Sequence, residues 1–132
     1  MSIKLYFLAL TVFFAIDMVW LGLIAKQFYA QQLSSMLRTD VNWVAALLFY
    51  ALFVAGLVVL ILQPALEKAS LTQALWHAAL FGLVTYATYD LTNLATLKNW
   101  PIAITIVDLL WGTTLSVSVT AITYLISKKI GL

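Results

Sequence analysis

The chain has 132 residues, of which 64% are apolar and 9% are charged, with a formal net charge of +2. This composition lies far outside the range of soluble domains and predicts a single integral membrane domain. The chain contains no cysteine and one histidine, His77, which excludes disulfides, thiol chemistry and a multi-histidine metal site. The few basic residues are scattered, so we expect no nucleic-acid partner, and no motif for a cofactor is present.

Four long apolar stretches predict an all-α, polytopic membrane protein, with four transmembrane helices in one compact bundle over residues 1–132. The expected spans are about 3–25, 41–62, 71–97 and 102–126. The first begins like a signal peptide, but no small-residue cleavage site follows, so we expect a retained helix. Gln63-Pro64 is expected to end the second span, because proline disfavours helix in the residue before it.

Between the first two spans, residues 26–40 are polar with a helical pattern of apolar side chains. These recur at i, i+4, i+7 and i+8 as Tyr29, Leu33, Met36 and Leu37. The spacing predicts a short amphipathic helix lying in the membrane interface. A bent extension of the first span and a helix that binds a partner protein are the alternatives.

Four spans would place both termini on one side of the membrane. That side would carry Lys4, Lys68, Lys128 and Lys129, and the other side Lys26, Arg38 and Lys98. Since basic residues favour the cytoplasmic side, four against three predicts that both termini are cytoplasmic.

The polar residues of the third span are concentrated in 86–101, which reads Y-A-T-Y-D-L-T-N-L-A-T-L-K-N-W-P. Helical spacing places Tyr86, Asp90 and Asn93 on one face and a row of threonines roughly opposite. A helix that is polar on two faces is expected to lie centrally in the bundle. The second span has no charge and is expected to face lipid.

Three aspartates lie inside the expected spans, at one depth. Asp17 is nine residues before Lys26, Asp90 is eight before Lys98, and Asp108 is seven after Pro101. At 1.5 Å per residue, each lies roughly 11–14 Å beneath the same membrane surface. We therefore predict that the three carboxyl groups meet in one pocket, which opens toward the surface bearing Lys26 and Lys98.

Two of these aspartates share a local pattern. D-M-V-W-L-G at 17–22 and D-L-L-W-G-T at 108–113 both place tryptophan three residues after aspartate, which puts acid and indole on one helix face. The two helices would run in opposite directions, as in a degenerate inverted repeat. The predicted ligand-binding residues are Asp17, Trp20, Tyr86, Asp90, Asn93, Thr105, Asp108 and Trp111.

The aspartates have a structural and a functional interpretation. Inserting an aspartate at a helix centre costs roughly 2.5–3.5 kcal/mol, whereas an interhelical hydrogen bond in a membrane averages only about 0.6 kcal/mol. Holding helices together is thus a poor explanation for three acids, and we favour a functional site. Without counter-charges, either some of these acids are protonated at neutral pH, or a bound cation or a water-filled pocket compensates for their charge. A hard cation bound by carboxylates is possible, although we predict no dedicated metal site.

The chain resembles a family of small bacterial inner-membrane proteins known as domain of unknown function 2177. The resemblance rests on the two D-x-x-W stretches, on Y-A-T-Y-D-L-T-N-L-A-T-L at 86–97 and on N-W-P at 99–101. It implies a four-helix protein of the bacterial inner membrane, and it brings neither an assigned activity nor catalytic residues.

Three classes of function remain open. The first is a carrier or binding protein that exchanges protons, or a cation, against a small amphipathic or lipid-like ligand, as a homodimer. The second is a membrane-embedded enzyme that acts on a lipid or isoprenoid, with Asp17, Asp90 and Asp108 as the candidate acid and base groups. The third is a small subunit or scaffold for another membrane protein. The sequence does not decide whether the chain is an enzyme.

Overall fold

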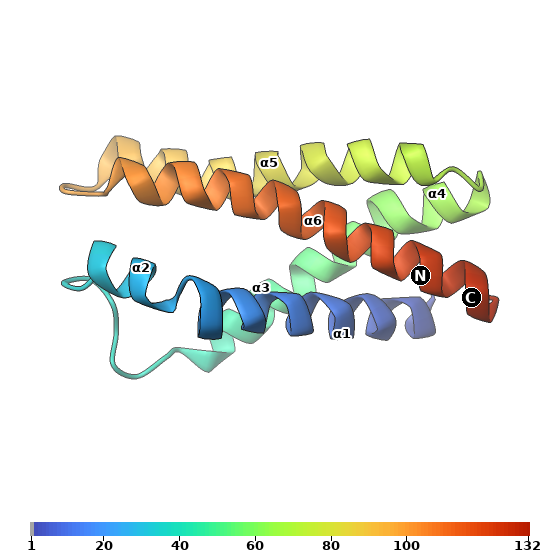
Figure 1. Ribbon diagram of the computed structural model, residues 1–132, viewed down its shortest axis with the longest axis horizontal. Helices are drawn as coiled ribbons and strands as arrows, with labels where there is room; N and C mark the ends of the chain where they lie inside the picture. The colour runs from blue at the N-terminus through green and yellow to red at the C-terminus, as the bar shows by residue number, and fades with distance from the viewer. Residues whose placement is uncertain (1) are drawn as a thin grey trace.

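The computed structural model describes residues 2–132, and every regular element in that range is helical. The helices are α1 (Ile3–Val19), α2 (Lys26–Gln32), α3 (Trp43–Leu57), α4 (Gln63–Glu67), α5 (Leu71–Thr96) and α6 (Ile102–Ile130), with π-helical turns over Trp20–Ile24 and Val58–Leu62 (Figure 1). The all-α prediction is confirmed.

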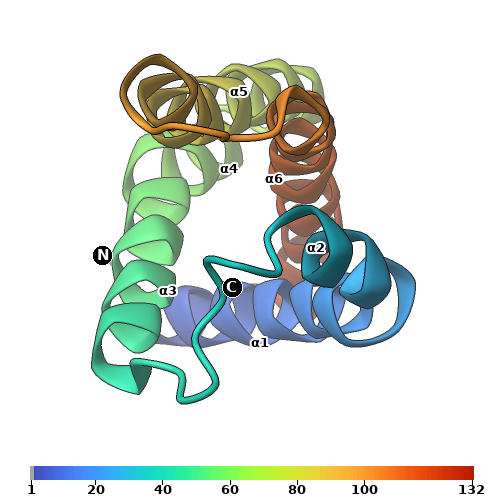
Figure 2. The ribbon, with the colours of Figure 1, turned by 90° about the vertical axis from the view of Figure 1, so that its left-hand side faces the viewer.

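The helices α1, α5 and α6 run along the long axis of the molecule, while α3 slants across it, and α5 runs antiparallel beside α6 (Figure 1). Seen from the end that carries α2, the segments α1, α3, α5 and α6 surround a common centre (Figure 2). Fully buried side chains of α1, α3 and α6, among them Phe13, Leu57 and Leu115, fill the core between them. Both termini lie at the end opposite α2 (Figure 1).

Three of the four expected spans correspond to helical segments that are long and apolar enough to cross a membrane. These are Ile3–Ile24, Trp43–Glu67 and Ile102–Ile130. The fourth expected span forms α5, which is long enough but is not among the three. The reason is composition, since α5 contains Asp90, Asn93 and a row of threonines that lower its hydropathy. The prediction of four membrane spans is therefore confirmed for three of them.

Pro64 does not end the helix that precedes it, contrary to the sequence prediction. The backbone N–H of Gln63 bonds to the carbonyl of Val58, five residues back, and α4 then continues to Glu67. Proline removes one N–H donor and its ring collides with the carbonyl four residues earlier. A wide π turn just before it accommodates the ring, and helices tolerate such turns as local bulges.

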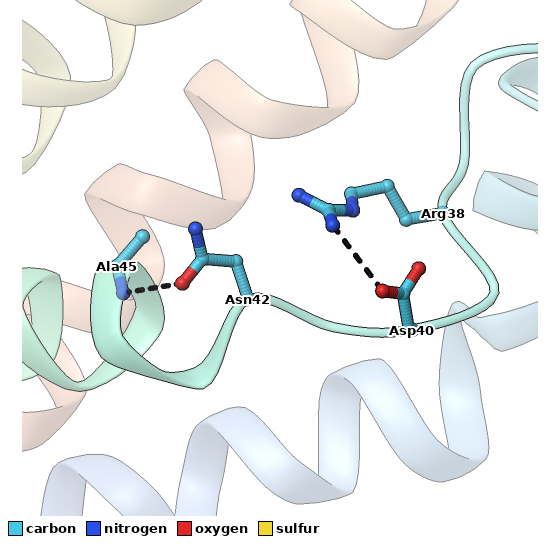
Figure 3. A network of polar contacts seen from close by, with 4 residues as sticks. All are labelled: Arg38, Asp40, Asn42 and Ala45. Atoms are coloured by element: carbon cyan, nitrogen blue, oxygen red, sulfur yellow. Dashed lines mark hydrogen bonds and ion pairs between the residues drawn. The ribbon is translucent and has the colours of Figure 1, made fainter.

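The amphipathic segment after α1 is helical only over Lys26–Gln32, which is shorter than the predicted 26–40. The remainder forms a turn and a loop in which Arg38 pairs with Asp40 at 3.3 Å, both side chains being exposed (Figure 3). Asn42 then caps α3 by accepting a hydrogen bond from the N–H of Ala45 at 3.2 Å (Figure 3).

The α6 helix also runs past its predicted end at residue 126. It stops at Gly131, whose φ of 78° is the left-handed conformation that glycine adopts readily after a helix. Lys128 and Lys129 in the last turn complement the negative end of the helix dipole.

Close packing of α5 on α6 depends on small residues. Gly82 lies against the backbone of Gly112 and the side chain of Ser116, and Gly112 lies against the ring of Tyr86. A methyl group at either glycine would overlap these atoms. Gly112 and Ser116 are four residues apart on α6, so these two small residues lie on one helix face and allow α5 to approach closely.

Candidate functional site

The halves of α1, α3, α5 and α6 nearest α2 border a cavity of about 380 Å³, which we call the aspartate chamber. This half of the molecule faces the viewer in Figure 2. The chamber wall consists of Asp17, Trp20, Leu21, Tyr29, Phe49, Tyr50, Thr85, Tyr86, Tyr89, Asp108 and Trp111. Of these eleven described residues, seven are aromatic, two are acids and none is Lys, Arg or His. The wall therefore offers aromatic faces and carboxylate oxygens without a positive charge.

Asp17, near the end of α1, is only 5% exposed and joins three helices. The Tyr50 hydroxyl of α3 donates to its Oδ2 at 2.8 Å, and the Trp111 Nε1–H of α6 donates to its Oδ1 at 3.3 Å. Both carboxyl oxygens thus have a neutral hydrogen-bond donor.

Asp108, half-buried in α6, accepts its hydrogen bond from a tyrosine of α2. The Tyr29 hydroxyl of α2 donates to its Oδ1, and the Trp20 Nε1–H donates to the Tyr29 oxygen at 3.4 Å. Burial, and then the bond to Asp108, raise the pKa of Tyr29 well above its usual value. Tyr29 is therefore a protonated donor to this carboxyl group near neutral pH.

The two D-x-x-W motifs meet at the chamber through their indole rings. Trp20 and Trp111 stack with centroids 4.3 Å apart and planes 9° from parallel. Each indole is connected by hydrogen bonds to the aspartate of the other motif. Trp111 donates directly to Asp17, while Trp20 donates to Tyr29, which in turn donates to Asp108. This reciprocal arrangement is what two antiparallel copies of one motif would produce when packed face to face.

Asp90 takes a different position from the other two aspartates. It is fully buried in α5, close enough to Asp108 for the two carboxyl groups to interact electrostatically. Among the described residues, neither of its oxygens has a hydrogen-bond partner, and Asp90 is not part of the chamber wall.

The remaining predicted site residues are divided between the chamber and the helix packing. Tyr86 lines the chamber and packs its ring on Gly112. Asn93 is half-buried outside the wall. Thr105 is 5% exposed and accepts a hydrogen bond from the Trp100 Nε1–H at 3.0 Å, which ties the α5–α6 turn to α6. The structure thus brings Asp17, Trp20, Tyr86, Asp108 and Trp111 to one cavity, and leaves Asp90, Asn93 and Thr105 outside its wall.

Tyr29 and Tyr50, whose hydroxyls bond the aspartates, are not among the site residues predicted from the sequence. Tyr50 belongs to the second span, whose lack of charge predicts a helix that faces lipid. Yet it lies nine residues after Val41, so the depth count that aligned the aspartates places its hydroxyl at the same level. The sequence pattern places Tyr29 on the apolar stripe of an interfacial helix, and it contains no signal that this side chain points toward Asp108. The other lining residues not predicted are Leu21, Phe49, Thr85 and Tyr89.

The arrangement can hold a cationic group but is poorly suited to a metal ion. Within the described residues, no three His, Cys, Asp or Glu side chains come together as metal ligands. Hard cations such as Ca²⁺ require six to eight oxygen ligands. Two carboxylates within an aromatic wall instead suit an organic cation, which also gains from the electron-rich ring faces.

Comparison with known proteins gives a family and no activity. No curated protein and no solved structure matches the chain. Residues 2–125 match a family described as predicted membrane protein (DUF2177). Because the match extends over nearly all of the helical region described above, this chain is a member of that membrane-protein family.

Proposed function

We propose that the chain is a membrane-embedded binding protein whose aspartate chamber exchanges protons for a small cationic ligand, as a proton-coupled carrier does. The supporting observation is that Asp17 and Asp108 line one cavity, and that none of the described residues in its wall is basic. An ionised carboxylate removed from water without a counter-charge costs several kcal/mol. A proton removes that cost in the empty chamber, and a bound cation removes it in the loaded one.

The hydrogen bonds of the chamber suit both states. The hydrogen-bond donors to the two aspartates are all neutral: Tyr50, Trp111 and Tyr29. When a cation displaces the protons of Asp17 and Asp108, these donors stabilise the resulting carboxylates and carry no positive charge that would compete with the ligand. Asp90 interacts electrostatically with Asp108, and neither of its oxygens has a hydrogen-bond partner among the residues that the structure describes. We assign it the role of holding a proton next to the binding carboxylate.

The test is cation binding with proton release. Purified protein in phosphatidylglycerol nanodiscs, titrated with tetramethylammonium chloride in weak buffer, should bind the ion and acidify the solution. Replacing Asp17 and Asp108 together by Asn should weaken binding by about tenfold or more, equivalent to about 1.4 kcal/mol. Asp40→Asn is the matched control, because Asp40 is an exposed acid in the loop before α3. Equal binding and acidification by the double variant and the control would refute the proposal.

We further propose that α5 crosses the membrane, giving four spans with both termini in the cytoplasm of a bacterial inner membrane. α5 extends beside α6, which is apolar enough to span. The hydroxyls of its exposed threonines are satisfied within the helix. Thr88 and Thr96 donate to the backbone carbonyls four residues earlier at 2.6 and 2.8 Å, and Thr92 also donates to the carbonyl four residues before it. A lipid-facing helix must satisfy its polar groups internally, and this face of α5 meets that requirement.

A further inference from the structure

We infer that the ligand of the aspartate chamber is an amphiphilic organic cation, an ammonium group on one alkyl chain, with its head in the chamber and its chain in a groove between α1 and α3. This inference rests on the proposed function and adds the chemical class of the ligand. Its starting point is a second cavity that shares one wall residue with the first.

The second cavity, here called the lateral groove, has a volume of about 430 Å³. It is lined by Leu10, Thr11, Phe14 and Ala15 of α1 and by Leu47, Tyr50 and Ala51 of α3. Its one aliphatic hydroxyl, that of Thr11, donates to the carbonyl of Phe7 at 2.8 Å. The groove therefore presents hydrocarbon, and it lies between two helices that are apolar enough to span a bilayer.

Tyr50 belongs to both cavities, and its hydroxyl bonds Asp17. The carboxyl group of Asp17 in the chamber is thus separated from the lateral groove by the side chain of Tyr50. A ligand whose charge is neutralised by Asp17 can place an attached chain along the groove by passing Tyr50. An uncharged lipid chain would occupy the groove but not the chamber, and a small cation would occupy the chamber but not the groove. A cation with an attached alkyl chain would occupy both.

The chemistry of the chamber selects the head group. Its carboxylates and the absence of basic residues in the described wall disfavour an anion. Seven aromatic side chains line the wall, and ammonium groups bind at aromatic faces, most strongly where water is excluded. The alkyl chain would keep such a ligand in the bilayer, so that it enters from the side.

The experiment compares two probes in phosphatidylglycerol nanodiscs, whose lipid carries no ammonium group. Dodecyltrimethylammonium and tetramethylammonium share a head group, and only the first has a chain. Ala15→Phe and Ala51→Phe fill the groove from exposed positions, and Ala45→Phe is the control because Ala45 is an exposed α3 residue that lines neither cavity. Binding is followed by the change in tryptophan fluorescence, to which Trp20 and Trp111 in the chamber wall contribute, and, independently, by equilibrium dialysis of labelled probe.

Filling the groove should weaken dodecyltrimethylammonium binding by about tenfold or more, while tetramethylammonium binding stays within about twofold and Ala45→Phe changes neither. Dodecyl maltoside, which has the same chain and a neutral head, should not compete. If both ammonium probes bind through Asp17 and Asp108 but the groove variants have no effect, the inference that the ligand places an alkyl chain in the lateral groove is wrong. The proposed function, cation binding in the chamber, then stands. If dodecyl maltoside competes equally, or the aspartate variants bind the long probe normally, the groove holds a chain alone and the inference is overturned. If neither ammonium ion binds, the proposed function fails as well.

Discussion

At the scale of single residues, the three aspartates differ in what surrounds them. Asp17 accepts hydrogen bonds from Tyr50 and Trp111, so its carboxyl group also satisfies two partly buried donors. Asp90 is fully buried and, among the described residues, satisfies none. The three carboxyl groups are therefore not expected to contribute equally to stability.

This difference predicts opposite effects of removing the two carboxyl groups. Asp17→Leu leaves two donors without an acceptor and should lower the free energy of unfolding by about 1–3 kcal/mol. Asp90→Leu removes an unpartnered polar group and should leave stability unchanged or raise it by up to about 3 kcal/mol. Unfolding in mixed micelles by a denaturing detergent measures both. Comparable losses in the two variants would show that Asp90 has a partner as important as those of Asp17.

Tyr29 gives a pH-dependent prediction. Burial and the bond to Asp108 raise its pKa above the usual 10.0, so the folded protein keeps this phenol protonated at pH values where an unfolded chain ionises it. The stability from Tyr29 is then complete below pH 10 and falls as the pH rises above that value.

Tyrosinate absorbance tests this directly. The difference between the native protein and Tyr29→Phe should show no ionisation of Tyr29 up to pH 10. In an Asp108→Asn background the phenol should ionise earlier, yet still above its usual value, because burial is the larger cause. Half-ionisation of Tyr29 at pH 10 in the native protein would contradict the buried, hydrogen-bonded geometry.

At the scale of elements, the α5–α6 pair sets how the chamber closes. Gly82 touches the backbone of Gly112, and this approach places Tyr86 and Trp111 on the chamber side of their helices. If α5 and α6 moved apart, the distance between the Tyr86 and Trp111 rings would increase and the chamber would open between them.

Gly82→Ala should therefore destabilise the protein by about 1–3 kcal/mol, because its new methyl group would overlap backbone and side-chain atoms of α6. Gly22→Ala is the matched control, since a methyl group there would lie within 4 Å of no side chain or other helix in the described chain beyond its immediate neighbours, and should change stability by no more than about 0.5 kcal/mol. The same detergent unfolding assay compares them. Similar values for both variants would mean that the helices are not in close contact at Gly82.

At the scale of the whole molecule, the number of membrane crossings fixes which face each turn reaches. The chain has no cysteine, so a single introduced cysteine reports its own position without background labelling. If α5 crosses, the α4–α5 turn and the C-terminus share one side, and the α5–α6 turn lies on the other with α2.

Lys68→Cys and Leu132→Cys should accordingly react with an impermeant maleimide only from the cytoplasmic side of oriented membranes. Lys98→Cys and Gln32→Cys should react only from the opposite side. All four positions are exposed in the structure, so an absence of labelling reflects the membrane and not burial. Labelling of Lys68→Cys and Lys98→Cys from one side would place α5 outside the bilayer and remove the fourth span.

The sequence by itself determined the class of protein and the level of the candidate site. Apolar stretches of membrane length predict helices wherever they occur, because a backbone in lipid must satisfy its own hydrogen bonds. Counting residues from the ends of those stretches aligned Asp17, Asp90 and Asp108 at one level, and of these three Asp17 and Asp108 line one cavity in the structure. The D-x-x-W spacing likewise identified the tryptophans, because helical geometry places i and i+3 on one face. All of these properties are local to one helix.

Only the tertiary structure decided which side chains meet at that level. Depth is one coordinate, and the direction in which a side chain points depends on how its helix is rotated against its neighbours. That rotation comes from contacts such as Gly82 on Gly112, and from π turns such as Trp20–Ile24, which shift the helix face by one residue. These long-range features bring Tyr50 to Asp17 and turn Tyr29 inward to Asp108, while Asp90 points into the packing beside the chamber. No spacing within a single helix contains that information, because it arises from the fit between helices that are distant in the chain.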